Sequence, residues 1–495
     1  MSKFLLIHPD DNVAVCLEAG SPGDQVTVGA YSVVLKEAIP VGHKVALVAI
    51  EKNRDIIKYG APIGHALESI EPGKHVHTHN LKTNLSDNLQ YDFNQKLNAP
   101  RYDKRELTFN GFKRSNGRVG IRNELWIVPT VGCVNGQAQQ IIDLFKQEMN
   151  PADIDAVEVF KHSYGCSQLG DDHVNTQKAL ADVINHPNAG GILVIGLGCE
   201  NNQIAHLKKF IGDYDESRVR YLVSQDVEDE VEAGLEMLKE IYAIMRQDKR
   251  EPLPLSELKV GLKCGGSDGF SGITANPLVG VFSDFLVAQG GTTILTEVPE
   301  MFGAETRLME RAADVTVFEK TVDLINGFKD YYNKHNLPIY ENPSPGNKDG
   351  GISTLEDKSL GCTQKGGTAT VVDVLAYAEP LKKNGLNLLS APGNDLVAAS
   401  ALGFSGCQLV LFTTGRGTPF GSFIPTMKIS TNSALYNKKR NWIDFNAGQL
   451  LEDKTMDALL EEFIQYIIAV AGGEKLRHEE SGFKEIAIFK TGVTL

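Results

Sequence analysis

Three histidines, His75, His77 and His79, occupy alternate positions in the segment "KHVHTHN". Alternate side chains of an extended strand lie on one face, so this spacing predicts a row of imidazoles. At about 3.3 Å per residue, the Cα atoms of His75 and His79 lie about 13 Å apart in a straight strand. One metal ion therefore does not reach all three unless the strand bends, and His77 with either neighbour is the feasible metal-binding pair.

A second group of reactive side chains follows apolar, strand-like segments further along the chain. These segments end in "TVGC", "HSYGC", "GLGCEN", "KCGGSD", "TEVPE", "APGND" and "TGRGTP". In open α/β sheets, ligands bind beyond the carboxyl ends of the strands, and glycines there let the backbone approach a ligand closely. The pattern predicts a pocket lined by polar and sulfur-containing residues: Cys133, His162, Cys166, Cys199, Cys264, Asp268, Glu297, Glu300, Asp395 and Arg416.

Two sets of these residues have the chemistry of metal ligands. Fe²⁺ and Mn²⁺ accept carboxylates and imidazoles, which favours the set Asp268, Glu297 and Glu300. The alternative set is made of the thiols Cys166, Cys199 and Cys264. Three thiolates could instead hold an iron–sulfur cluster with one open iron. The sequence does not choose between the two sets, nor between a single ion and a cluster.

The elements that position these residues fall into several domains, because 495 residues exceed what one core usually holds. Residues 1–80 contain short alternating apolar runs between Gly, Pro and Asp turns, which predicts a small all-β module. Residues 81–110 are polar and read as a linker. From residue 111, strands alternate with helices, which predicts parallel sheets covered by helices. A break near 247–258 divides this part into domains 111–250 and 251–495. Four further histidines, His186, His206, His335 and His478, are expected at the surface.

The composition narrows the classes of function. A net charge of −14 argues against nucleic acid as a partner. The sequence contains no apolar run of 18 residues, so it does not predict a membrane span. The N-terminal segment lacks the features of a secretion signal. Seven cysteines without a CxxC pair indicate reduced thiols and a cytoplasmic protein. Neither a GxGxxG motif nor a GK[ST] motif follows a strand, which disfavours a nicotinamide-dependent oxidoreductase and a P-loop enzyme.

Long uninterrupted blocks spread over nearly the whole chain resemble the altronate/galactarate dehydratase family. They include "IIKYGAPIG", "HVHTHNLKTNLSD", "RVGIRNELWIVPTVGCVNG", "HSYGCSQLGDDH", "CGGSDGFSGITANPLVG", "TEVPEMFGAE", "ENPSPGNKDGGISTLEDKSLGCTQK" and "TTGRGTPFG". The resemblance is greater to altronate dehydratases, chiefly through "HVHTHNLKTNLSD" and "GLGCENNQ". It implies an N-terminal β-clip (SAF-type) domain, a middle domain with dimer contacts and a Rossmann-like C-terminal domain that carries a metal.

The activity that the resemblance implies is the loss of water from a sugar acid, dependent on Fe²⁺ or a similar ion such as Mn²⁺. For this sequence the expected reaction converts D-altronate into 2-dehydro-3-deoxy-D-gluconate, a step of galacturonate catabolism, in a cytoplasmic homodimer. Abstraction of the proton next to the carboxylate needs a base and stabilisation of the enediolate. We expect His162 to be the base, with His43 or Lys44 as the second catalytic group.

The remaining candidates are expected to bind the substrate. Arg416 offers a guanidinium fork that matches a carboxylate, and Lys348 in "PSPGNK" would hold hydroxyl groups. His77 and His79 would hydrogen-bond the polyhydroxy acid from the end of the β module, so the metal is sought mainly in residues 162–300. Two other functions stay open at this point: dehydration of galactarate, and binding of a sugar acid without catalysis.

Overall fold

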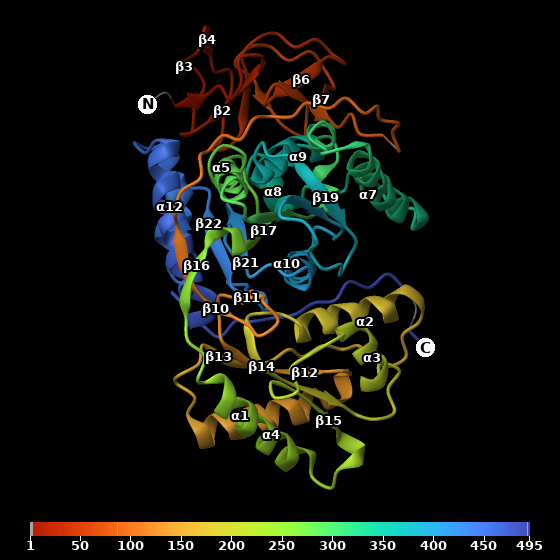
Figure 1. The fold of residues 1–495 in the computed structure, drawn as a ribbon. Helices are drawn as coiled ribbons and strands as arrows, with labels where there is room; N and C mark the ends of the chain where they lie inside the picture. Colours follow the sequence, from red (N-terminus) through yellow and green to blue (C-terminus); the bar gives the residue numbers. More distant parts are fainter. Residues whose placement is uncertain (1–2, 87, 493) are drawn as a thin grey trace.

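The computed structural model describes residues 3–86, 88–492 and 494–495. The β-strands of the N-terminal module lie at one end of the molecule, a large α/β domain lies in the middle, and a smaller α/β domain lies at the other end (Figure 1). The predicted fold class, an all-β start followed by α/β domains, is confirmed. Among the described residues, no helix combines the length and apolar character needed to cross a bilayer.

The N-terminal module is built from short strands in three small sheets. Strand β3 shows why these residues form strands: in QVTV, exposed and buried residues alternate, as they do in a strand with one face on the core. Strand β9 belongs to the module, since it pairs with β7 through His65 and Lys82. The strands are β1 (Phe4–Leu5), β2 (Val13–Cys16), β3 (Gln25–Val28), β4 (Tyr31–Val34), β5 (Lys44–Ala46), β6 (Asp55–Lys58), β7 (Ala61–Ala66), β8 (His75–Val76) and β9 (Leu81–Lys82).

The segment after β9 has no helix or strand among its described residues until β10 (Thr108–Lys113). It lies across the large domain, because Leu85, Tyr91 and Tyr102 pack against the core of that domain. The Tyr91 hydroxyl donates to Glu305 Oε1 at 2.6 Å. The polar stretch 83–107 therefore acts as a strap that fastens the β module to the large domain.

The smaller α/β domain contains a parallel four-stranded sheet in the order β13-β12-β14-β15. Strand β12 is buried along its whole length, as expected for a central parallel strand covered on both faces. Helices α1 and α4 pack on one face, and α2 packs between the other face and the large domain. The elements are β12 (Glu124–Pro129), α1 (Asn135–Met149), β13 (Ala156–Val159), α2 (Gly170–Ile184), β14 (Ala189–Gly196), α3 (Ile204–Ile211), β15 (Val219–Val223) and α4 (Glu230–Met245).

Two short strands join the two α/β domains. Strand β16 (Glu251–Pro254) pairs antiparallel with β10, and β10 also pairs with β11 (Val119–Gly120). The chain therefore enters the smaller domain after β10 and β11 and returns to the large domain through β16, so both crossings lie in one small sheet. The second crossing is close to the boundary predicted near residue 250.

The large domain contains a seven-stranded, all-parallel sheet in the order β19-β20-β18-β17-β21-β22-β23. Its central strand, β17, ends at Cys264. The strands are β17 (Lys259–Cys264), β18 (Thr292–Leu295), β19 (Val371–Leu375), β20 (Gly385–Leu389), β21 (Leu409–Thr414), β22 (Thr426–Ser430) and β23 (Phe445–Asn446). The helices are α5 (Ala275–Ala288), α6 (Thr306–Met309), α7 (Val315–Lys334), α8 (Pro345–Asp349), α9 (Leu355–Cys362), α10 (Asp395–Phe404), α11 (Ser433–Lys438), α12 (Met456–Ala471) and α13 (Arg477–Glu480).

Three histidines of the α/β domains are buried and bonded to backbone. The surface positions predicted for His186 and His478 are wrong, since these side chains are 3% and 1% exposed. His186 Nε2 lies 3.0 Å from the Cys407 carbonyl of the neighbouring domain, a contact that sequence periodicity does not reveal. His478 Nε2 accepts from the Thr426 amide at 2.8 Å. Burial lowers the pKa of His162 and His186 to about 4 and that of His478 to about 3.

These histidines make the fold acid-sensitive. They stay neutral in the folded protein, but the unfolded chain takes up a proton on each at its ordinary pKa of about 6.5. We therefore expect the free energy of unfolding to fall as the pH drops from about 6.5 towards about 4, by on the order of 2 kcal/mol for each imidazole. Urea unfolding at pH 7, 6 and 5 measures this. Equal stability at the three pH values would contradict it, and His186→Gln should make the slope shallower.

Candidate active site

A pocket of about 700 Å³ opens beyond the carboxyl end of β17, where the sequence predicted a site. Its floor is formed by Cys264 and by the glycines 265 and 266 that follow it. One side is formed by the segment that contains α8, and the other by the loop that leads into α10. The lining combines polar and apolar surface and consists of Cys264, Gly265, Gly266, Glu300, Glu341, Asn342, Pro343, Ser344, Pro345, Asn347, Lys348, Lys358, Gly393, Asn394, Asp395 and Leu396.

The carboxylate of Glu300 collects several hydrogen bonds in the wall of this pocket. Lys358 Nζ donates to Glu300 Oε1 at 2.7 Å. The thiols of Cys264 and Cys362 both donate to Glu300 Oε2 at 3.2 Å, and their sulfur atoms are 3.3 Å apart. Lys358 also donates to the amide oxygens of Asn342 and Asn347. A single buried carboxylate thus faces an ammonium group and two thiols beside the open pocket.

The charges around Glu300 fix its protonation state. Burial alone would raise the pKa of this carboxyl, but Lys358, Lys365 and Lys263 lower it to about 2. Burial alone would lower the pKa of Lys358, but Glu300, with Cys362 and Cys264, raises it above its usual value. The Cys362 thiol has a raised pKa because it bonds to Cys264 and is buried. At neutral pH the group therefore contains a carboxylate, ammonium ions and protonated Cys362, which suits an anionic ligand better than a cation.

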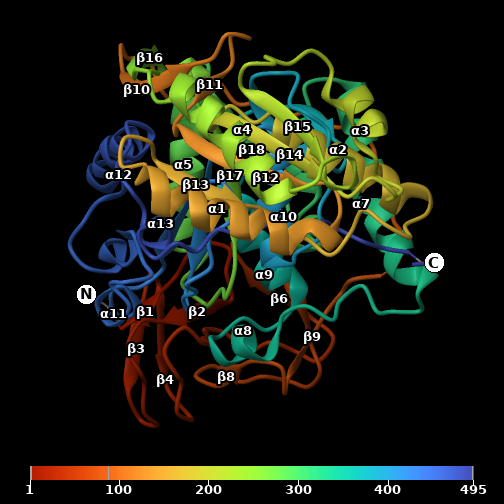
Figure 2. The same ribbon diagram turned by 90° about the horizontal axis from the view of Figure 1, so that it is seen from below.

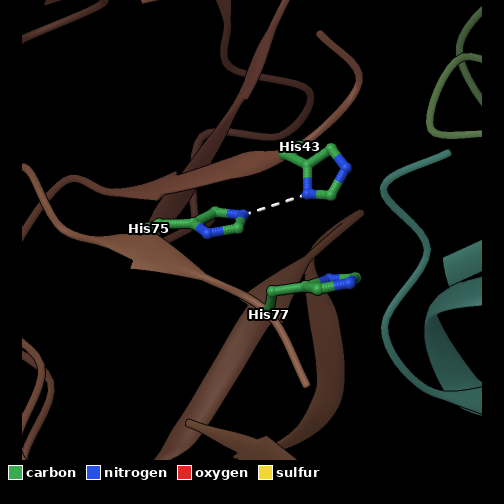
Figure 3. Close-up of side chains that lie close together, drawn as sticks. All are labelled: His43, His75 and His77. Carbon is green, nitrogen blue, oxygen red and sulfur yellow. Dashed lines mark hydrogen bonds between the residues drawn. The ribbon is translucent and has the colours of Figure 1, made fainter. Parts of the chain in front are cut away.

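A different group of side chains is suited to a cation. His43, His75 and His77 place one ring nitrogen each within 4.8 Å of one another, and Figure 3 shows their rings gathered in one place. Strands β5 and β8 pair with Lys44 opposite Val76, so continuing the register puts His43 opposite His77. His75 lies two residues before His77 and shares its face. We call these three residues the histidine cluster.

Hydrogen bonds orient the imidazoles of the histidine cluster. His43 Nε2 donates to the Asp349 carbonyl at 3.2 Å, which leaves the lone pair on Nδ1 pointing at His75 Nε2, 3.0 Å away. His77 Nδ1 bonds to Ser353 Oγ at 3.1 Å, which leaves Nε2 for a ligand. Burial is the main cause that lowers the pKa of His75 and His77 to about 3. Neutral rings held by a carbonyl or hydroxyl are typical metal ligands, so these residues fit Fe²⁺ or Mn²⁺.

The histidine cluster and the pocket adjoin each other. Lys348 lines the pocket, and the next residue, Asp349, bonds to His43 through its carbonyl. In Figure 2, α8 lies beside the strands of the β module. Glycines make this approach possible, because a Cβ on Gly351 would come within 2.2 Å of the Gly42 carbonyl oxygen. The site is therefore shared between the β module and the large domain.

A buried ion triplet joins the same two parts of the chain. Lys44 and Lys58 of the β module each donate to one carboxylate oxygen of Asp357 in α9, both at 2.9 Å. Lys44 also donates to the Gly351 carbonyl at 2.7 Å. Burial lowers the pKa of Lys44 to about 8, and Asp357 partly opposes this. Because Lys44 is fully buried and bonded to Asp357 and Gly351, its place suits positioning of the module rather than contact with substrate.

The other predicted catalytic residue lies elsewhere. His162 is buried in the smaller domain, where Nε2 lies 2.8 Å from the Pro129 carbonyl and Nδ1 accepts from the Tyr164 amide at 3.2 Å. Both ring nitrogens therefore form hydrogen bonds with backbone groups. Because neither nitrogen is left for a substrate, this environment does not support a role as base. His43 was expected to be the second catalytic group, and the structure places it in the histidine cluster.

The predicted metal sets do not assemble as expected. Asp268 is buried and bonded to Thr431 and Asn432, and Glu297 is bonded to Lys263. Only Glu300 of the carboxylate set lines the pocket. Of the thiol set, Cys264 belongs to the pocket, whereas Cys166 and Cys199 follow strands of the smaller domain's sheet. The thiol set joined residues that follow strands of two different sheets, whereas the carboxylates follow the neighbouring strands β17 and β18 but bond to different side chains.

The residues predicted to bind the substrate, Arg416, Lys348, His77 and His79, lie in or near the pocket and the histidine cluster. Lys348 lines the pocket. Arg416 is exposed beside it, and its amide donates to the carbonyl of Gly266 at 3.0 Å. His77 joins the histidine cluster, while His79 is exposed with its ring 5.4 Å from that of His75.

Sequence reasoning missed Lys358 and Cys362. Both belong to the segment "STLEDKSLGCTQK", in which Thr354 caps α9 by accepting from the Asp357 amide. The sequence could have indicated them through the many charged residues in this segment. The structure shows that the segment forms α9, a helix in which every residue is buried.

Three family models together match most of the chain. They are described as "Altronate/galactarate dehydratase SAF domain" over residues 2–84, "D-galactarate dehydratase/Altronate hydrolase, second domain" over 111–246, and "D-galactarate/Altronate dehydratase, C-terminal" over 255–494. The altronate dehydratases of Bacillus subtilis and Escherichia coli are 59% and 58% identical to the chain, with full coverage of both sequences. The galactarate dehydratase of Escherichia coli is 33% identical over 95% of the chain and 93% of its own length. The chain belongs to the altronate/galactarate dehydratase family.

Proposed function

We propose that this protein is an altronate dehydratase, which converts D-altronate into 2-dehydro-3-deoxy-D-gluconate and water. The observation that carries the proposal is the high identity, over the full length, to two altronate dehydratases, compared with the much lower identity to the galactarate enzyme. The pocket supports it, since its volume and its lysines and amides, which lie beside the carboxylates of Glu300, Glu341 and Asp395, suit a carboxylate with several hydroxyl groups.

In the proposed reaction, C2 loses a proton and the hydroxyl on C3 leaves as water. The resulting enol then takes up a proton on C3 and becomes the 2-keto acid. Lys348 and Lys358 supply positive charge where the enediolate develops, which is the electrostatic help such an elimination requires. We assign protonation of the leaving hydroxyl to Lys358, whose ammonium group is held in the pocket wall by its hydrogen bond to Glu300 Oε1.

The divalent metal belongs in the histidine cluster in this proposal. His43 and His77 are already held by backbone or side-chain oxygens of the segment that lines the pocket, so an ion there would lie beside the substrate. When bound, such an ion acts as a Lewis acid that polarises a carboxylate or hydroxyl oxygen. We propose Fe²⁺ or Mn²⁺ as the ion, as the family resemblance implies, and imidazole is an accepted ligand of iron.

The histidine cluster yields a testable prediction. We expect His75→Ala to weaken Mn²⁺ binding by at least about tenfold, because one of three imidazole ligands is lost. The matched control is His79→Ala, since His79 is exposed and lies outside the cluster. Equilibrium dialysis with Mn²⁺, read by the paramagnetic signal of the free ion, compares the two variants. Equal affinities for both would contradict the assignment.

One assay tests the proposed function. The reduced, iron-loaded protein is incubated with D-altronate and, separately, with galactarate, and the 2-keto product is measured. Turnover of altronate with a kcat/KM well above that of galactarate supports the proposal. A preference for galactarate, or binding of altronate without product, would overturn it in favour of the other two functions considered for the sequence.

The remaining proposals follow from the family resemblance. We infer a homodimer, a cytoplasmic location and a place in galacturonate catabolism. Gel filtration with light scattering tests the first of these, and a monomer at working concentration would contradict it.

A further inference from the structure

Three of the seven cysteines are exposed, and all three belong to the smaller α/β domain. They are Cys133, Cys166 and Cys199, whereas the other four cysteines are buried. Unpaired cysteine is normally among the most buried residue types. Three exposed thiols in one domain therefore need an explanation other than packing.

The three thiols lie at the same edge of one sheet. Cys133 follows β12, Cys166 follows β13 and Cys199 follows β14, and these strands are parallel neighbours with β12 in the centre. Each cysteine comes within seven residues of the end of its strand. This is the edge at which open α/β sheets bind their ligands.

Hydrogen bonds fasten the three cysteine loops to one another. The Gly132 amide donates to the Tyr164 carbonyl, and the Asn202 amide donates to the Gly165 carbonyl, both at 2.9 Å. The Asn202 side chain also donates to the Thr130 carbonyl at 3.0 Å. Gly165 has a φ of +100°, and a Cβ there would come within 2.1 Å of the Thr130 oxygen. The loops are thus held close together before any ligand binds.

The spacing of the three thiols is too wide for a single ion. Among the described residues, the sets with ligand atoms within 4.8 Å of one another are the histidine cluster and Cys264 with Glu300 and Cys362. A tetrahedral ion with metal–sulfur bonds of about 2.3 Å needs its thiolates closer than that limit. A cubane cluster keeps its thiolates further apart, because each binds a different iron.

We propose that Cys133, Cys166 and Cys199 hold a [4Fe–4S] cluster in the smaller domain, with the fourth iron left for an oxygen ligand. The surroundings of the thiols agree with this. Gln225 Nε2 lies 3.6 Å from Cys199 Sγ and donates to it, the kind of hydrogen bond that tunes cluster thiolates.

Two buried acceptors beside the thiols have no donor. Asn135 Oδ1 and Asn202 Oδ1 lack a hydrogen-bond partner, and they follow Cys133 and Cys199 by two and three residues. Hydroxyl groups of a ligand on the open iron would supply the missing donors.

Reconstitution tests the cluster directly. The full chain is incubated anaerobically with ferrous iron, sulfide and a thiol reductant, desalted, and analysed for iron and acid-labile sulfide. We expect about four of each per chain with broad visible absorption. Cys133→Ser, Cys166→Ser and Cys199→Ser should each lose the sulfide, while Cys264→Ser, the matched control from the pocket, should keep it. Thermal unfolding of each variant checks that it is folded.

Oxidation tests the open iron. One equivalent of ferricyanide should take one electron from the cluster and release one Fe²⁺, leaving a [3Fe–4S] cluster with its own paramagnetic signal. Iron without labile sulfide in the reconstituted wild type, or sulfide kept in a folded Cys133→Ser variant, would overturn the cluster. Retention of all iron after oxidation would overturn the open position. Neither result bears on turnover of altronate, so failure here is distinct from failure of the proposed function.

Discussion

Replacing Lys358 with Met should lower kcat by about 10²- to 10⁴-fold, the range typical for loss of a group that handles protons. Met keeps the length of the side chain but removes the ammonium that donates to Glu300 Oε1 and to Asn342 Oδ1. Both the charge that stabilises the enediolate and the proton beside the leaving hydroxyl are then lost. Steady-state kinetics with altronate measures the effect, with metal content checked to be equal.

Lys348→Met is the matched control for this prediction. Lys348 lines the same pocket but has no bond to Glu300 among the described contacts. We expect its loss to raise KM, with a much smaller fall in kcat than Lys358→Met shows. Similar falls in kcat for both variants would mean that Lys358 contributes only charge to binding.

Glu300→Gln gives a second readout of the same pair. Burial lowers the pKa of Lys358, and Glu300 is the main group that raises it. With a neutral amide in its place, the pKa of Lys358 should fall, so the alkaline limb of the pH–rate profile should move to lower pH. An unchanged alkaline limb would show that Lys358 is not the group that titrates in turnover. A purely structural role of Glu300 would lower activity at all pH values alike.

The fold was largely predictable because its signals are local. Alternation in segments such as QVTV and buried runs such as ELWIVP identify strands without knowledge of their neighbours. The rule that ligands bind at the carboxyl ends of parallel strands then located the pocket, including Cys264 and Glu300. The same rule failed for His162. This histidine also follows a strand, in the smaller domain, but both of its ring nitrogens form hydrogen bonds with backbone groups.

The histidine cluster could not be predicted because its third member comes from a different strand. The spacing of His75, His77 and His79 suggested a straight row, but β8 has only two residues and the chain turns after it. Asn80 makes this turn by bonding the His75 carbonyl, which directs His79 outward. His43 takes the third place through the pairing of β5 with β8, and strand pairing depends on contacts that a single sequence does not display.

Asp357 should be the residue whose loss most weakens the attachment of the β module. Its carboxylate is buried between Lys44 and Lys58, whose side chains are 0% and 1% exposed. Burial would raise the pKa of Asp357, but the two lysines hold it well below its usual range. Asp357→Asn leaves two buried ammonium groups without a countercharge, which typically costs about 3–5 kcal/mol.

The expected result of Asp357→Asn is therefore a release of the β module as well as a loss of stability. Lys44 also holds the Gly351 carbonyl, and the nearby Asp349 carbonyl orients His43, so displacement of this segment should weaken Mn²⁺ binding in the histidine cluster. Protease cleavage at the start of the strap 83–107 should become faster, because release of the β module would free the residues that connect it to the strap. The control is Glu379→Gln, which breaks an exposed pair with Lys382 and should cost at most about 1 kcal/mol. If urea unfolding, cleavage rate and Mn²⁺ affinity are the same in both variants, the ion triplet does not hold the two parts of the site together.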